Sequence, residues 1–251
     1  MTLSRRQKLT ILALALYWPA VFILAHIPIP ALVYEAQVSD KSLHFAVYLV
    51  LAFLLWFSIS PDRNVRWRKP TVWWAVLVVV AYGVMDELLQ TLVGRNCEVL
   101  DFAADLAGAV AGFILFTFLA FWPSLLVVTG ITIFLMTNLA RANVAELLPI
   151  ASAIYYLLAY GLFTLLWIKH MRLYLSLRAP GLRWAALALV VPGCFLLIVK
   201  LGSVVLGKNF TWEGVAFSAG GIAAVVLISL VASFCRMRTQ KPSGGGFEGT
   251  V

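Results

Sequence analysis

Charged residues are scarce in this chain of 251 residues: they make up 12% of it, whereas hydrophobic residues make up 63%. A soluble domain is about a quarter charged and about half apolar. A soluble fold of this length could not bury so much hydrocarbon. The composition therefore predicts an all-α integral membrane protein, because helices satisfy their own backbone hydrogen bonds inside a bilayer.

Cysteine is also rare. The three cysteines, Cys97, Cys194 and Cys235, lie in separate segments and show no paired spacing. Neither a disulfide framework nor a cysteine-based zinc site is indicated. The sequence specifies no metal and no cofactor, and it leaves the oligomeric state open.

The net charge of +8 could suggest a nucleic-acid partner. The basic residues, however, fall between hydrophobic segments, where they set topology and meet anionic lipid headgroups. We therefore expect membrane lipids as partners and no nucleic acid.

Hydrophobic runs long enough to cross a bilayer, about 20 residues each, occur about eight times. Only Trp122 and Pro123 separate the fourth run from the fifth, so these two could merge or shift. The ending is polar and rich in glycine, which predicts a disordered tail. The expected helices span residues 9–25, 42–59, 71–92, 102–121, 124–140, 147–168, 184–206 and 213–235.

The two halves of the chain resemble each other at an offset of about 111 to 113 residues. Residues 41–56 align with 152–167, for example, and 93–108 align with 206–220. The offset predicts two parallel four-helix repeats. The predicted division is a first unit at 1–122, a degenerate second unit at 123–236 and a cytoplasmic tail at 237–251. The second unit has lost most of the charge, so we expect the first to carry any chemistry.

Lysine and arginine are distributed unevenly between the two sides of the predicted membrane. One set of loops and termini carries about 14 of them and the other side about four. The positive-inside rule then predicts a bacterial cytoplasmic (inner) membrane protein with both termini in the cytoplasm. Most of the acidic residues fall at the outer side.

Polar residues concentrate near the outer ends of two expected helices, 42–59 and 71–92. The spacing of the first set is i, i+3, i+7, which places it on one helix face, and the second set covers an arc of about 100°. Ionisable groups inside a membrane boundary are costly and indicate a functional site. The two sets are Lys41, His44 and Tyr48, and Asp86, Glu87 and Gln90.

The expected helix 102–121 continues the polar cluster. Asp101 and Asp105 lie one turn apart at its start, above Gly108 and Gly112 on the same face. A small-residue step of this kind lets a neighbouring backbone approach closely. The helix is therefore predicted to form the inner seam, with its carboxylates directed into a shared cavity.

A structural role is the main alternative for these charges. The pairs Asp40/Lys41 and Arg95/Asp101 are as compatible with salt bridges that hold helices together as with a binding site. His44 is more often a hydrogen-bonded interior residue than a metal ligand.

Asp86 beside Glu87 fits the structural alternative less well. Neighbouring carboxylates in a low dielectric repel each other when both are ionised. Such a pair more often shares a proton, binds a cation or meets a positively charged ligand.

Several of these motifs agree in order and spacing with a known family. They are Asp40-Lys41-x-x-His44-Phe45-x-x-Tyr48, Tyr82-Gly83-x-x-Asp86-Glu87-x-x-Gln90, Gly94-Arg95 and Asp101-x6-Gly108-x3-Gly112. This pattern, over about residues 9 to 121, resembles the VanZ-like family, which is named for a membrane protein associated with resistance to glycopeptide antibiotics of the teicoplanin type. Asp105 stands where the family pattern has asparagine, which adds a charge.

The resemblance and the charges together lead to one main functional hypothesis. The outer cluster would bind or modify the headgroup of a lipid-linked molecule or cell-wall precursor, with a link to glycopeptide resistance. In a catalytic version, Asp86 or Glu87 acts as the base, Asp101 and His44 assist, and Lys41 and Arg95 hold phosphate. The other expected binding residues are Asp40, Tyr48, Tyr82, Gln90 and Asp105.

Two alternatives remain open from the sequence. The first is a transporter or lipid scramblase, which repeated units would suit. The second is non-catalytic shielding, in which the protein sequesters a glycopeptide antibiotic or a precursor without changing it.

Overall fold

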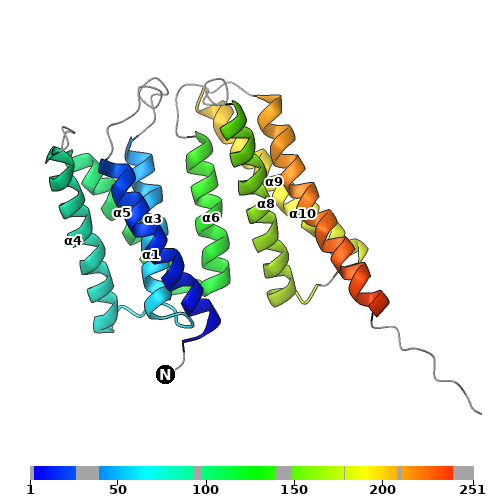
Figure 1. Ribbon diagram of the computed structural model, residues 1–251, viewed down its shortest axis with the longest axis horizontal. Coiled ribbons are helices and arrows are strands. Elements are labelled where there is room, and N and C mark those ends of the chain that lie inside the picture. The colour runs from blue at the N-terminus through cyan, green and yellow to red at the C-terminus, as the bar shows by residue number, and fades with distance from the viewer. Residues whose placement is uncertain are drawn as a thin grey trace, which may run out of the picture. The chain divides into compact units, whose positions relative to one another are not determined.

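The computed structural model describes residues 3–26, 40–92, 98–138, 149–177, 179–207 and 211–239. These residues form helices and short connections, with no strand among them (Figure 1). Eight of the described helices are long and apolar enough to cross a membrane. The predicted all-α membrane fold with about eight spanning helices is therefore confirmed.

The helices follow the predicted runs to within a few residues, and two differences matter most. The fourth and fifth are separated at Leu119 and Ala120, whereas Trp122 and Pro123 lie in the first turn of the next helix, where proline needs no amide hydrogen. The sixth continues to Tyr174, beyond the expected end at residue 168. The bounds are α1 Arg5–His26, α3 Asp40–Ile59, α4 Pro70–Leu92, α5 Val99–Phe118, α6 Phe121–Asn138, α8 Pro149–Tyr174, α9 Leu182–Val205 and α10 Trp212–Thr239.

The chain divides into two compact units. The first comprises Met1–Ser152 with Ile198–Thr211, and the second Ala153–Leu197 with Trp212–Val251. In the first unit, four helices pack against α3: α1, α4, α5 and α6. The predicted division at residue 122 and the duplication remain predictions.

Helix α3 is the centre of the first unit. Its aromatic residues Phe53 and Phe57 are buried and contact the rings of Phe116 on α5 and Phe121 on α6. In a bilayer, where lipid tails are as apolar as the side chains, such packing rather than exclusion from water drives helix association. This aromatic core fixes one end of the unit, and the polar residues lie toward the other.

Helix α5 approaches α3 closely along its small residues. A methyl group added at Gly108 would collide with the backbone carbonyl oxygen of Phe45, and one at Gly112 would come within 3.2 Å of the Cβ of Ala52. The predicted small-residue contact face of this helix is therefore present. Its partner is α3, the more deeply buried of the two.

The second unit has a similar close contact of its own. A methyl group at Gly221 on α10 would collide with the carbonyl oxygen of Leu157 on α8. Nearby, the rings of Phe163 and Phe195 stack with their centroids 4.2 Å apart. The described part of this unit contains fewer buried charged groups than the first unit.

Candidate functional site

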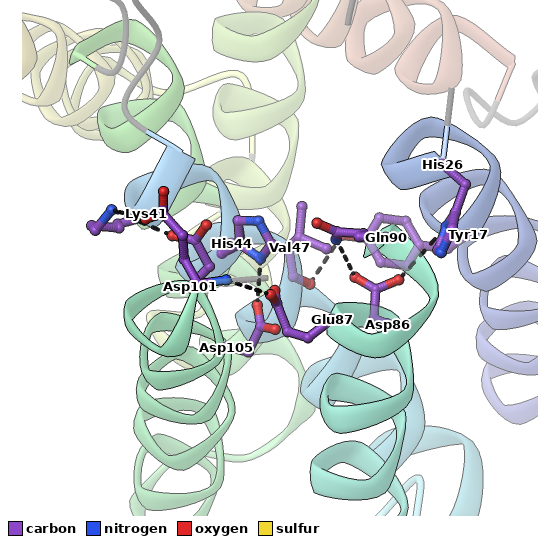
Figure 2. A network of polar contacts seen from close by, with 11 residues as sticks. Tyr17, His26, Lys41, His44, Val47, Asp86, Glu87, Gln90, Asp101 and Asp105 are labelled. Atoms are coloured by element: carbon purple, nitrogen blue, oxygen red, sulfur yellow. Dashed lines mark hydrogen bonds and ion pairs between the residues drawn. The ribbon is translucent and has the colours of Figure 1, made fainter. Parts of the chain in front are cut away.

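Four helix ends meet at one end of the first unit. Helices α1 and α4 run toward this end, and α3 and α5 begin there (Figure 1). Polar residues that are far apart in the sequence therefore come together, as Figure 2 shows. We refer to this group as the polar cluster; its described members are His26, Lys41, His44, Asp86, Glu87, Gln90, Glu98, Asp101 and Asp105.

The centre of the polar cluster joins α3, α4 and α5. The Nδ1 atom of His44 lies 2.9 Å from Oδ1 of Asp105, and both side chains are buried. Glu87 reaches the same place from α4, and ligand-type atoms of the three side chains lie within 4.8 Å of one another. Two carboxylates and an imidazole therefore share one site.

A second group lies at the start of α5, toward the surface. The Nζ atom of Lys41 lies 3.2 Å from Oε2 of Glu98 and 3.5 Å from Oδ1 of Asp101. The backbone N–H of Glu98 donates to Oε2 of Glu87 at 3.2 Å, which connects this group to the centre. The charge of Lys41 is thus shared between two carboxylates.

A third group joins α4 to α1. The Nε2 atom of Gln90 donates to Oδ2 of Asp86 at 3.1 Å, and Nδ1 of His26 lies 3.9 Å from the other oxygen of Asp86. Close by, the hydroxyl of Tyr17 donates to the carbonyl oxygen of Val47 at 3.0 Å, tying α1 to α3.

Asp86 and Glu87 direct the side-chain contacts described above to different helices. Asp86 makes its contacts with α1 and with Gln90, whereas Glu87 contacts α5. Consecutive residues on a helix are about 100° apart, which sends the two side chains in different directions. The carboxylate that lies near Glu87 is that of Asp105.

Tyr48 and Tyr82 are buried in this unit. Their rings stack with centroids 5.9 Å apart, and Tyr82 also meets the ring of Trp18 edge-on at 5.2 Å. The structure thus gives both tyrosines a packing role, although Tyr48 also borders a cavity.

That cavity has a volume of about 150 Å³ and lies between α1, α3 and α4. Three polar side chains of the polar cluster line it: His44, Asp86 and Gln90. Its remaining walls are Val21, Leu24, Ala25, Leu43, Val47 and Tyr48.

An apolar groove of about 560 Å³ lies between α1 and α4. Phe22 and Tyr82 mark its end toward the polar cluster, because the next residues one turn along each helix are His26 and Asp86. Its lining is Ile11, Leu14, Ala15, Trp18, Pro19, Phe22, Tyr82 and Met85.

The structure brings most of the predicted site residues together. Arg95 and the side chain of Asp40 lie outside the described residues, so their expected pairs remain predictions. Two contributors, His26 and Glu98, were not predicted. His26 stands at a helix end and has no periodic relation to the other members. Glu98 precedes Asp101 by three residues and Asp105 by seven, which is the spacing of one helix face, so its sequence signal was present but was not used.

These features define a multi-pass helical membrane protein with buried acidic groups at one end of its first unit. Residues 7–120 match the model of the VanZ/LLP1 family, which confirms the resemblance seen in the sequence. No curated protein and no solved structure was found to match the chain.

Proposed function

We propose that the protein binds a lipid-linked molecule of the cell envelope, with the headgroup at the polar cluster and a hydrocarbon chain in the α1–α4 groove. The observation that carries this proposal is the adjacency, on the same two helices, of an apolar groove and a cavity that three side chains of the polar cluster border. One end of such a ligand is charged and the other apolar, and the two sites offer the matching surfaces.

The two sites are one helical turn apart. His26 follows Phe22 by four residues on α1, and Asp86 follows Tyr82 by four on α4. Four residues of helix rise about 6 Å, a short distance compared with a lipid. A ligand lying along α1 and α4 would therefore contact both.

The charge of the cluster favours a headgroup with a positive group, or one that carries a cation. Five carboxylates (those of Asp86, Glu87, Glu98, Asp101 and Asp105) surround one lysine in the described residues. Because Lys41 is already paired with two of them, it supplies little net positive charge for a phosphate. An amino group would find unbalanced carboxylates directly.

The location follows from the distribution of basic residues. We propose that both termini lie in the cytoplasm, which places the polar cluster at the outer face of the cytoplasmic membrane. Envelope precursors carry their headgroups on that face after export. Capture of such a precursor would link the protein to glycopeptide resistance, as the family resemblance implies.

The test is a comparison of lipids bound to the purified full chain. Membranes containing the wild type, an Asp86→Asn/Glu87→Gln variant or an Asp62→Asn control would be solubilised, and the lipids that co-purify identified by mass spectrometry. Asp62 pairs with Arg6 near the N-terminal end of α1, far along that helix from His26, so Asp62→Asn serves as a loss of one carboxylate charge outside the site.

We expect one lipid class to be enriched with the wild type and the control and lost in the double variant. A chemically altered lipid in cells expressing only the intact acids would add a catalytic step to the proposal. Equal lipid profiles in all three preparations would overturn headgroup recognition by these acids. If the protein moved lipid across the membrane of reconstituted vesicles but no lipid co-purified with it, that result would support transport instead.

A further inference from the structure

Three helices each contribute one potential metal ligand to the centre of the polar cluster. His44 comes from α3, Glu87 from α4 and Asp105 from α5, and one ligand-type atom of each lies within 4.8 Å of the others. In Figure 2, the carboxylates of Glu87 and Asp105 lie beside each other below the imidazole ring.

Two buried oxygens of these three ligands have no hydrogen-bond partner among the described residues. They are Oε1 of Glu87 and Oδ2 of Asp105, and their side chains belong to residues only 4% and 1% exposed. The other oxygen of each carboxylate is already occupied, by the N–H of Glu98 and by His44. Burying an unpartnered charged oxygen is costly, so each requires a cation or a proton.

We propose that His44, Glu87 and Asp105 bind one divalent transition-metal ion, Zn²⁺ or Mn²⁺. One imidazole and two carboxylates suit such ions, whereas Mg²⁺ and Ca²⁺ prefer oxygen ligands alone. Three protein ligands would leave at least one coordination position open.

The separations are close to those of a bound ion. Zn²⁺ holds nitrogen and oxygen ligands at about 2.0–2.2 Å, which places neighbouring ligand atoms about 3.4 Å apart. Closing from at most 4.8 Å requires shifts of about 1 Å, within reach of side-chain rotation. The backbones are held firmly, because Gly108, one turn after Asp105, packs against the backbone of Phe45, next to His44.

The metal would also explain why a histidine borders the cavity. His44 is both one of the three proposed metal ligands and a lining residue of the 150 Å³ cavity. An open coordination position near that cavity would accept an oxygen of water or of a phosphate. This consequence for the ligand rests on the proposed function, whereas the metal site itself does not.

The test measures metal binding by the purified full chain in detergent, without any lipid ligand. The protein would be stripped with a chelator, titrated with Zn²⁺ or Mn²⁺ in a calorimeter, and its bound metal counted by mass spectrometry after desalting. Variants would be His44→Gln, Glu87→Gln and Asp105→Asn, with Asp62→Asn as the control outside the site.

We expect one ion per chain for the wild type and the control, and a rise in Tm when the metal is added. Loss of a residue that only hydrogen-bonds to a ligand lowers metal affinity by about 10–100-fold. Each of these variants removes a ligand itself, so its affinity should fall by more than that. Equal stoichiometry and affinity in all three variants would overturn the site.

A separate result would identify a shared proton instead of a metal. In that case neither the wild type nor Asp62→Asn binds an ion more tightly than the three ligand variants do, and Glu87→Gln raises the Tm of the stripped protein. Because none of these measurements requires a lipid, a failure here leaves the proposed lipid binding standing, and the reverse also holds.

Discussion

The Nδ1 atom of His44 lies 2.9 Å from Oδ1 of Asp105, although 61 residues separate the two in the chain. This contact joins α3 to α5 at the start of both helices, beyond the glycine contact that brings their backbones together. It also gives the carboxylate of Asp105 a partner on another helix.

The first prediction concerns the balance of charge in this buried group. His44→Phe removes the imidazole and leaves the carboxylates of Glu87 and Asp105 facing each other. Breaking a buried charged pair costs about 3–5 kcal/mol, so the free energy of unfolding in detergent should fall by about 3 kcal/mol. Adding Glu87→Gln in the same chain should restore part of this loss, and strictly additive effects would contradict the proposed coupling.

A second prediction follows from the close approach of α5 and α3. Gly108→Ala places a methyl group against the carbonyl oxygen of Phe45 and should lower the free energy of unfolding by about 1–3 kcal/mol. The matched control is Gly193→Ala on α9, where a methyl group would meet nothing within 4 Å. That control should be neutral or stabilising by up to about 1 kcal/mol, because alanine favours helix. Similar losses for both would count against the close contact.

The groove gives a third prediction. Ala15→Phe fills part of the α1–α4 groove and should reduce the lipid that co-purifies with the chain, while the free energy of unfolding changes little. Leu16→Phe is the control, because Leu16 is exposed and does not line the groove. Unchanged lipid content in Ala15→Phe would show that the chain of the bound molecule lies elsewhere.

Lys41 provides the fourth prediction. Its side chain is 47% exposed, and exposed ion pairs contribute little to stability, so Lys41→Met should barely affect unfolding. Removing this cation should nevertheless tighten Zn²⁺ or Mn²⁺ binding, because the nearby carboxylates keep their charge. A calorimetric titration of the variant against the wild type measures the difference; weaker metal binding would contradict an acidic metal site.

The helices could be predicted from the sequence because hydrophobic runs of membrane length are unambiguous. The break between α5 and α6 was placed too late, at Trp122 and Pro123, because proline fits both a helix start and an interruption. In the site, the periodic spacing of Lys41 and His44 and the acids at positions 101 and 105 pointed to the correct helix faces.

The partners within the site could not be predicted. Sequence proximity suggested Asp86 with Glu87, but helix rotation sends each to a different neighbour. The contact of His26 with Asp86 and that of Lys41 with Glu98 depend on how helices dock, which spacing along one helix does not report. Gly108 was recognisable because two glycines four residues apart on one helix face indicate a close helix contact, although they do not say which helix makes it.

The contact between Gly221 and Leu157 bears on the history of the chain. Gly221 lies 113 residues after Gly108, and Leu157 lies 112 residues after Phe45, so the same glycine-to-carbonyl contact recurs at the spacing of the predicted repeat. If the halves descend from one ancestral unit, selection has retained this glycine contact between two helices in both halves, whereas the second half has lost most of the ionisable groups. Charges can be lost one residue at a time, whereas any side chain larger than hydrogen at the glycine would push two helices apart. The glycine would then be the slowest position of such a unit to change, and the best one from which to trace its descent.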